Sequence, residues 1–242
     1  MAFDGLLEEL KEKKNNALGQ GGPERVKKQH DRGRLTARER IDLMLDPGSF
    51  VEFGVLACSD MPGMEDKTAA DGVIMGYGLL DKRRIALMAS DFTVLASTLA
   101  RVSGKKIHDF KNQIVENRLP FVFLGEGGGG RVPDGQGSIG MASSAMMGNK
   151  SIFPMYTHLR VSPVVMATIG QCYGVPMWQA CQSDFVVQVK GGTLSVAGVR
   201  ALKRVIAANY SDEDMGGWKI HAEITGIADQ VAEDEKDCFR II

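Results

Sequence analysis

The chain has 242 residues, of which 44% are apolar and 24% charged, as is typical of a globular protein with a sizeable core. Its formal net charge of −1 gives it no overall attraction to nucleic acid or to an anionic membrane. The N-terminal stretch is polar and unlike a secretory signal, and no apolar run reaches the roughly 20 residues that span a bilayer. The four cysteines show no C-x-x-C pairing, which favours reduced thiols. We therefore expect a cytoplasmic protein with no metal in this chain.

The N-terminal residues predict a charged helical extension over residues 1–48. A Gly-Gly-Pro break at 21–23 is followed by a basic stretch, 25–34. A further helix is expected from Thr36, because Thr36 and Glu39 have the spacing of a capping box, in which each side chain satisfies a free backbone amide.

From residue 49 onward the pattern changes to alternating strands and helices. Strands are expected at 50–57, 72–80, 84–90, 120–124, 163–169 and 184–189, and helices at 97–115, from Ser138, at 175–181 and at 199–208. Continuous apolar strands that alternate with helices favour an α/β fold with a largely parallel sheet. The strand-strand-helix order within 72–115 suggests a spiral of such units. Residues 49–242 are therefore predicted to form one α/β domain.

The chemistry suggested by the residues alone lies in the backbone. Glycine occurs 29 times and is densest between residues 125 and 140. Residues 127–130 follow one predicted strand, and residues 170–176 follow another and lead into a helix. Main-chain N–H groups at such junctions can bind an anion or a developing oxyanion, although the same glycines would also suit simple tight turns. The G-x-G-x-x-G pattern at 135–140 lies too far from its preceding strand for a dinucleotide site.

Several sequence blocks point to one family. The longest, His30-Asp-Arg-Gly-Arg-Leu-Thr-Ala-Arg-Glu-Arg-Ile41, runs on to Leu45-Asp-Pro-Gly-Ser-Phe50. Shorter blocks follow in order at 71–73, 76–78, 91–94, 104–107, 128–135 and 215–229. Together they resemble the carboxyltransferase (β) subunits of biotin-dependent acyl-CoA carboxylases and of the related decarboxylases and transcarboxylases, over nearly the whole chain.

The resemblance implies a crotonase-like fold, a ββα spiral superhelix, and an acyl-CoA substrate. In that family backbone amides hold the thioester enolate that receives the carboxyl group from carboxybiotin. The corresponding amides here would be those of Gly174 and Val175, where family members usually carry two glycines. Val175 and Tyr173 would crowd a site that glycine keeps open.

The resemblance also suggests where the rest of the substrate lies. Gly128, Gly129, Gly130 and Arg131 would shape the channel for the acyl and pantetheine groups. Lys105 and Lys106 are candidates for contacts with CoA phosphates, or they are ordinary solvated lysines of a helix.

Family chains carry two related halves, and this chain corresponds to the first, acyl-CoA-binding half. The resemblance implies that biotin is carried on a partner protein, the biotin carboxyl carrier protein, and that another chain supplies the second carboxyltransferase half in a hetero-oligomer. A biotin carboxylase would be a further partner. Two alternatives stay open: a biotin-dependent acyl-CoA decarboxylase subunit, and a non-catalytic assembly subunit whose pocket Tyr173 and Val175 block.

Overall fold

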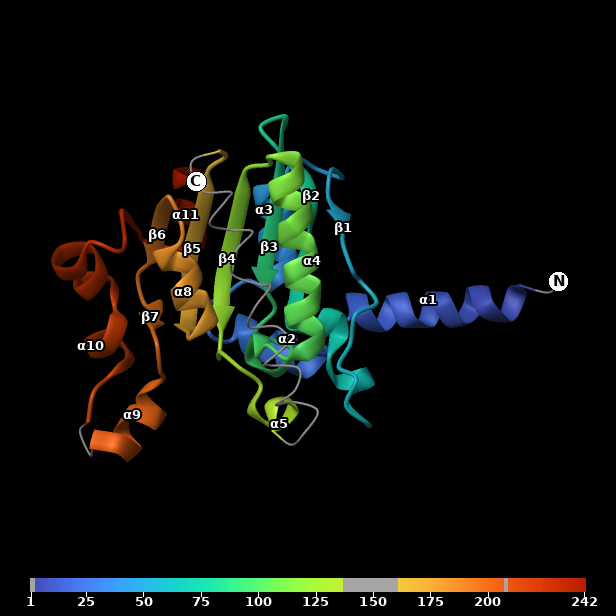
Figure 1. Cartoon of the computed structure of the whole chain (residues 1–242), viewed down its shortest axis with the longest axis horizontal. Helices are drawn as coiled ribbons and strands as arrows, with labels where there is room; N and C mark the ends of the chain where they lie inside the picture. Colours follow the sequence, from blue (N-terminus) through green and yellow to red (C-terminus); the bar gives the residue numbers. More distant parts are fainter. Residues whose placement is uncertain (1–2, 137–160, 207–208) are drawn as a thin grey trace.

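The computed structural model describes residues 3–136, 161–206 and 209–242. Within these ranges a single twisted sheet is covered by helices on both faces (Figure 1). The strands are β1 (Val51–Glu52), β2 (Val73–Leu80), β3 (Arg83–Ser90), β4 (Phe121–Gly127), β5 (Val164–Tyr173), β6 (Phe185–Val189), β7 (Thr193–Ser195) and β8 (Gln230–Ala232). The α-helices are α1 (Asp4–Leu18), α2 (Pro23–His30), α3 (Ala37–Met44), α4 (Arg101–Asn117), α5 (Val132–Gly135), α8 (Val175–Cys181), α9 (Val199–Ile206), α10 (Asp212–Gly216) and α11 (Glu235–Ile241).

The strand order is β1-β2-β3-β4-β5-β6-β8, and β7 pairs with the end of β5. β2 pairs antiparallel with both β1 and β3, whereas β3 through β8 pair in parallel. The turn between β2 and β3 places Asp81 and Lys82 at φ 49° and 64°. Two consecutive left-handed residues suit a tight hairpin. The predicted strand-strand-helix unit is confirmed as β2, β3 and α4.

Each face of the sheet has its own apolar core. Side chains alternate between the faces along a strand, so neighbours such as Leu87 and Met88 enter different cores. One core is closed by α3 and α11, and the other by α4 and α8. The predicted capping box of α3 is present, because the Thr36 side chain accepts from the Glu39 amide and Glu39 accepts from the Thr36 amide.

Three strand predictions had wrong limits: those of β1, of β5 and of β4, which continues to Gly127. The first strand ends at Glu52, because Gly54 turns at φ 65° against the side chain of Lys106. β5 continues four residues beyond its predicted end, to Tyr173, and β7 was not predicted. Gly170 therefore lies inside a strand, where a Cβ would approach Glu126 Oε1 to 2.5 Å.

The helix predicted from residue 97 begins at Arg101, because residues 95–97 form a left-handed turn of their own. Ser103 caps α4 by accepting the Ala100 N–H at 2.7 Å. The helix predicted from Ser138, and the part of the G-x-G-x-x-G pattern beyond Gln136, lie outside the described residues.

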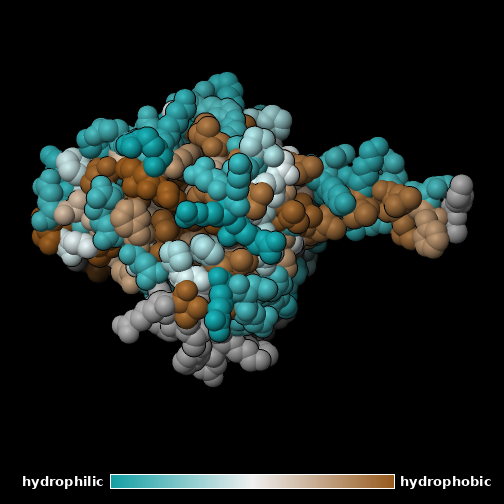
Figure 2. Space-filling model, turned by 90° about the horizontal axis from the view of Figure 1, so that it is seen from above, coloured by the Kyte–Doolittle hydropathy of each residue, from teal (hydrophilic) through white to brown (hydrophobic). Residues whose placement is uncertain are grey.

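The N-terminal helix α1 extends away from the sheet (Figures 1 and 2). Its apolar residues Phe3, Leu6 and Leu7 are exposed along its length. Among the helices of the described ranges, none is long and apolar enough to cross a membrane.

A buried carboxylate fixes the remaining N-terminal segment to the sheet. Glu126, near the end of β4, is fully buried and forms ion pairs of 2.7 Å with both Arg34 and Arg40. Gln29 donates a hydrogen bond of 2.8 Å to the same carboxylate. Arg40 also pairs with Glu235 of α11 at 2.7 Å, so one network joins both ends of the described chain to the central strand.

Replacing Glu126 with glutamine should lower the free energy of unfolding by about 3 kcal/mol, because it removes the negative charge that pairs with Arg34 and the buried Arg40. Urea denaturation should show a lower midpoint with an unchanged slope. The control is Lys13→Gln, which removes an exposed ion pair with Glu9 on α1 and should leave the midpoint unchanged. A Glu126→Gln midpoint equal to wild type would contradict this role.

Candidate functional site

Three loops meet at the carboxyl ends of β3, β4 and β5. The Gly128 amide donates to the Ala96 carbonyl at 2.8 Å, which joins the loop after β4 to the loop after β3. The Leu99 amide donates to the Gly129 carbonyl at 2.8 Å and strengthens the same junction. In open α/β sheets ligands bind at this edge of the sheet. The structure thus brings the predicted glycine segments together at a position suited to a ligand.

The loops after β4 and β5 touch through two glycines. Gly129, at φ 89°, lies so close to β5 that a Cβ would be 3.2 Å from the Tyr173 carbonyl oxygen. A Cβ on Gly174, at φ 67°, would be 3.7 Å from the Gly129 Cα. Both positions have a left-handed backbone, which glycine adopts without strain, and at Gly129 there is also little room for a side chain.

The amides of the two loops differ in their availability. The Gly174 N–H donates to the Ser195 carbonyl at 3.1 Å. Val175 is the first residue of α8, where an N–H has no partner within the helix. In the described part of the chain, no hydrogen bond engages the N–H groups of Val175, Gly129 or Gly130. Of the predicted pair, Val175 therefore presents the free donor in this arrangement.

The two side chains expected to crowd the site behave differently. The Tyr173 hydroxyl donates a hydrogen bond of 2.5 Å to Asp212 of α10, and its ring lies beside Gly198. Burial, with the Asp212 carboxylate adding to it, raises the pKa of the Tyr173 phenol. The Val175 side chain is 37% exposed beside the junction. The hydrogen bond to Asp212 thus holds Tyr173 in place, whereas the Val175 side chain remains partly exposed at the ends of the strands.

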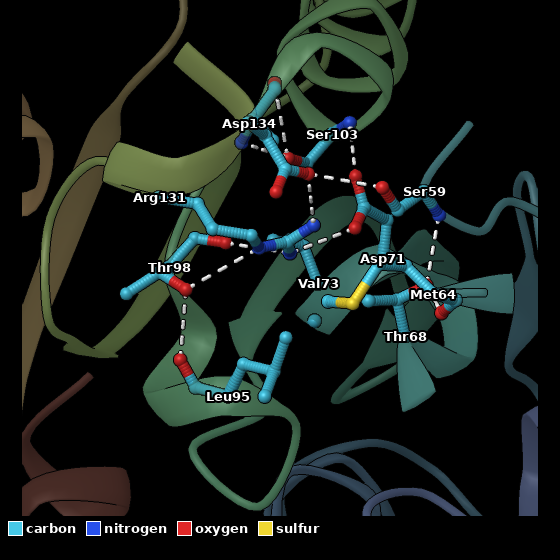
Figure 3. Close-up of polar contacts among 12 residues, drawn as sticks. Ser59, Met64, Thr68, Asp71, Val73, Leu95, Thr98, Ser103, Arg131 and Asp134 are labelled. Atoms are coloured by element: carbon cyan, nitrogen blue, oxygen red, sulfur yellow. Dashed lines mark hydrogen bonds and ion pairs between the residues drawn. The ribbon is translucent and has the colours of Figure 1, made fainter. Parts of the chain in front are cut away.

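Arg131 lies inside the protein (Figure 3). Its guanidinium forms ion pairs with Asp71 at 2.8 Å and with Asp134 at 3.1 Å, and it donates to the Thr98 carbonyl at 2.8 Å. Its side chain is 4% exposed, and the Asp71 side chain is fully buried. Arg131 thus holds the loop that follows Gly130 against the loop after β3. Arg131 therefore fixes the conformation of the site's loops from inside the protein.

Asp71 connects Arg131 to the start of α4. Its second oxygen accepts the Ser103 amide of α4 at 2.6 Å, while Ser59 donates to Asp134 at 2.9 Å. Asp71 has φ 46°, a left-handed conformation that is uncommon outside glycine but that aspartate adopts more readily than most residues. Figure 3 shows these side chains converging between α4 and the loop around Arg131.

The structure separates the two candidate lysines. Lys105 is exposed and pairs with Asp109 one turn along α4. Lys106 is buried and donates to the carbonyls of Ala70 at 3.0 Å and Val73 at 2.6 Å. Burial lowers the pKa of the Lys106 amine to about 8. Lys106 therefore binds backbone carbonyls on either side of Asp71 in sequence. Lys105 and Lys106 do not form a common anion site.

A strained turn at the site escaped the sequence analysis. Leu95, Ala96 and Ser97 have φ values of 47°, 55° and 48°, and this left-handed conformation costs about 1–2 kcal/mol per non-glycine residue. Such strain persists where surrounding contacts impose it, and it clusters at functional sites. Here the Ser97 hydroxyl donates to the Gly72 carbonyl at 2.8 Å, and the Gly128 amide engages Ala96. Leucine, alanine and serine gave no local signal for this geometry.

Among the described residues, no group of three or more His, Cys, Asp or Glu side chains is arranged to hold a metal ion. The chemistry that the described strand ends offer consists of backbone N–H donors and a glycine junction open to solvent at Gly128 and Gly130.

A family model for the carboxyl transferase domain matches residues 28–242. The chain belongs to this family. It is 34% identical to the propionyl-CoA carboxylase beta chain of Saccharopolyspora erythraea, an alignment that covers 98% of this chain and 43% of the relative. The chain thus spans less than half the length of the carboxylase chains it resembles.

Solved structures agree with this assignment. A transcarboxylase 12S structure with methylmalonyl-coenzyme A bound superposes with a TM-score of 0.83 at 28% identity, over 98% of this chain and 46% of that one. A Pseudomonas malonate decarboxylase hetero-tetramer gives 0.71 at 25% identity, over 86% of this chain and 80% of that one. The predicted crotonase-like carboxyltransferase fold is confirmed.

Replacing Arg131 with alanine should lower the free energy of unfolding by about 3 kcal/mol, because the buried Asp71 carboxylate loses its cation. The matched control is Arg101→Ala, which removes a partly exposed ion pair with Asp60 and should cost less than about 1 kcal/mol. Urea denaturation of both variants measures the difference. Equal losses would refute the structural role of Arg131.

Stability should respond to the ionisation of Lys106. The pKa of about 8 in the folded protein is below the ordinary 10.5, so between these values the unfolded chain binds more protons. The contribution of Lys106 to the free energy of unfolding therefore rises as the pH increases through this window. Relative to Lys106→Met, the wild type should gain about 2 kcal/mol between pH 7 and pH 9.5. A difference that stays constant in urea denaturation would contradict the burial of this amine.

Proposed function

We propose that this chain is the acyl-CoA-binding part of a biotin-dependent acyl-CoA carboxyltransferase, and that it stabilises the thioester enolate. The observation that carries the proposal is the junction of Gly129 with Gly174 at the ends of β4 and β5, beside the free Val175 amide. Membership of the carboxyl transferase domain family supports the same reaction class.

The proposed chemistry requires little from side chains. Removing a proton from the α carbon of an acyl thioester places negative charge on the thioester oxygen. Preorganised N–H donors lower the energy of that charge without reorganising. The Val175 amide would supply one donor, and the unengaged amides of Gly129 and Gly130 on the neighbouring loop would supply further donors. The Gly174 amide would join them on release from the Ser195 carbonyl.

The loop after β4 would line the channel for the acyl and pantetheine groups. Gly128 and Gly130 are exposed and carry no side chain, so a narrow substrate could lie against their backbone. Arg131 would fix this surface through Asp71 and would not itself project into the channel. The Val175 side chain, at the channel mouth, would restrict the size of the acyl group.

Biotin, carried on a partner protein, would supply the carboxyl group. We propose that a second carboxyltransferase half is a separate partner or a further part of the same protein, because the chain spans less than half the length of the carboxylase relatives. The acyl-CoA-binding loops would then face that partner in an oligomer.

One observation favours a second candidate, an acyl-CoA decarboxylase subunit. The chain covers 80% of the matched malonate decarboxylase chain, and that protein is a hetero-tetramer. A separate subunit of about this length is therefore compatible with decarboxylation. Identification of the co-purifying proteins separates the two candidates, because an ATP-using biotin carboxylase belongs only with carboxylation.

Calorimetric titration of the purified chain with several acyl-CoAs and free CoA tests the proposal. Saturable binding that depends on the acyl group would support a thioester site in this chain. Binding that appears only when a co-purifying partner is present would place the site at the interface. Absence of binding in both states would overturn the catalytic proposal and leave an assembly role.

Replacing Gly129 with alanine should weaken acyl-CoA binding at least about tenfold, because a Cβ would press on the Tyr173 carbonyl and separate the two loops. The matched control is Gly48→Ala, which also forces a side chain onto a left-handed residue, φ 71°, but has open space around it. Gly48 lies near the β2–β3 turn, at the opposite edge of the sheet.

Both variants should lose stability, Gly129→Ala the more because its Cβ also meets backbone, and only Gly129→Ala should lose affinity. Calorimetry and urea denaturation on the same samples give both quantities. Equal affinities of the two variants for acyl-CoA would remove the glycine junction from the binding site.

A further inference from the structure

The last residues of β5 exchange one neighbouring strand for another. Residues 165–168 pair with β6, whereas residues 171–173 pair in parallel with the three-residue strand β7. This ladder continues for one more residue, because the Gly174 amide donates to the Ser195 carbonyl at 3.1 Å. Whether the Gly174 amide is available to a ligand therefore depends on the position of β7.

The segment that contains α10 packs against the other side of β7. Figure 1 shows β7 between β5 and α10. Gly216, at the end of α10, has no room for a side chain, because its Cβ would meet the Leu194 carbonyl oxygen. The same carbonyl accepts a hydrogen bond of 2.7 Å from His221 Nε2. β7 and α10 therefore form one closely packed unit.

Asp212, the first residue of α10, fastens this unit to β5. One of its carboxylate oxygens accepts the Tyr173 hydroxyl at 2.5 Å, and the other accepts the Gln171 side-chain amide at 3.0 Å. Residues two apart on a strand point to the same face, so both donors come from one side of β5. Hydrogen bonds to a charged acceptor are roughly twice as strong as neutral ones. Asp212 thus joins α10 to β5, with β7 between them.

The Tyr173 ring restrains the loop after β7 as well. A Cβ on Gly198 would be only 3.2 Å from this ring. Within the same loop, the Ser195 hydroxyl donates to the Ala197 carbonyl at 3.0 Å. Because β7 and α10 are packed together, moving the Ser195 carbonyl away from β5 strains the ring contact and the hydrogen bonds to Asp212.

The position of β7 decides how many adjacent donors the site offers. While the Ser195 carbonyl is engaged, only Val175 of the two neighbouring amides is available. If that carbonyl withdrew, Gly174 and Val175 would present two adjacent amides to one oxyanion. A single preorganised donor typically changes the rate of such a reaction by about 10² to 10³. Residues that hold β7 in place therefore bear directly on the strength of the site.

We propose that Asp212 is a positioning residue, which acts through Tyr173 and Gln171 to keep the Ser195 carbonyl on the Gly174 amide. The inference rests on the proposed function and names the contact that limits its oxyanion site to one of two neighbouring donors. The Asp212 carboxylate and the Tyr173 hydroxyl bind each other, so their effect on the substrate passes through the backbone of β7.

The first measurement is hydrogen–deuterium exchange of the Gly174 amide, followed by NMR. Tyr173→Phe removes the hydroxyl, and Asp212→Asn leaves one acceptor for two donors. Exchange at Gly174 should be at least about fivefold faster in both variants, because local opening of β7 costs less. The Val175 amide serves as the internal reference, and the same spectra show whether each variant is folded.

The matched control is Tyr77→Phe. It removes a partly buried hydroxyl that donates to Gln113 at 2.6 Å, on a strand three positions away from β5. Exchange at Gly174 should stay at the wild-type rate in this variant.

The second measurement is calorimetric titration of the same proteins, with any co-purifying partner, using an acyl-CoA and its nitronate analogue. The nitronate carries a negative charge in place of the enolate. Tyr173→Phe and Asp212→Asn should bind the nitronate about fivefold to tenfold more tightly, because the released Gly174 amide adds a hydrogen bond to a charged group. Affinity for the neutral acyl-CoA should not change. Loss of a purely structural contact would strengthen neither interaction.

The outcomes separate this proposal from the proposed function. Unchanged exchange at Gly174 in both variants would overturn the role of Asp212, and so would faster exchange without a gain in nitronate affinity where the wild type binds both ligands. If neither ligand binds any of the proteins, the proposed function fails. Faster exchange at Gly174 would in that case still support the hold of Asp212 on the Ser195 contact, and unchanged exchange would overturn it.

Discussion

The arrangement of the site depends on one buried carboxylate. Glu126 lies on the central strand β4 and compensates two arginines that the N-terminal segment brings into the core. A buried charge is tolerated only when it is paired, so the segment that carries Arg34 and Arg40 has one favourable position on the sheet. That position sets α2 against the loop after β3. The longest sequence block of the family, from His30 to Ile41, includes both arginines and thereby acquires a physical explanation.

A second buried ion network supports the glycine loop from the other face of the sheet. Glu126 faces the helices α3 and α11, whereas Asp71 and Arg131 lie beside α4. Only a few residues of β4 and its loop separate the two networks. Glycine-rich loops lack side chains that could fix their own conformation. The two networks hold this loop at both ends, so the exposed Gly128 and Gly130 keep their positions without side chains of their own.

The features that the sequence revealed are those encoded within a few residues. The capping box at Thr36 and the continuous apolar strands rest on local rules, and the structure confirms them. The family resemblance gave the fold. The glycine segments were identified as a pair, but their contact depends on how β4 and β5 align. Local patterns could not show that Lys106 is buried or that Arg131 is committed to Asp71, because both partners lie more than thirty residues away in sequence.

The strained turn after β3 depends on contacts with distant residues that local sequence patterns do not show. Nothing local favours a left-handed Ala96, and its cost of about 1–2 kcal/mol must be offset by contacts from elsewhere in the chain. The Gly128 amide and the Gly72 carbonyl supply such contacts, and both belong to loops that the buried ion networks hold. The turn in return holds the loop after β4, because the Ala96 carbonyl accepts the Gly128 amide. A change that relaxed the turn would therefore disturb the glycine junction, although the glycines themselves would remain unaltered.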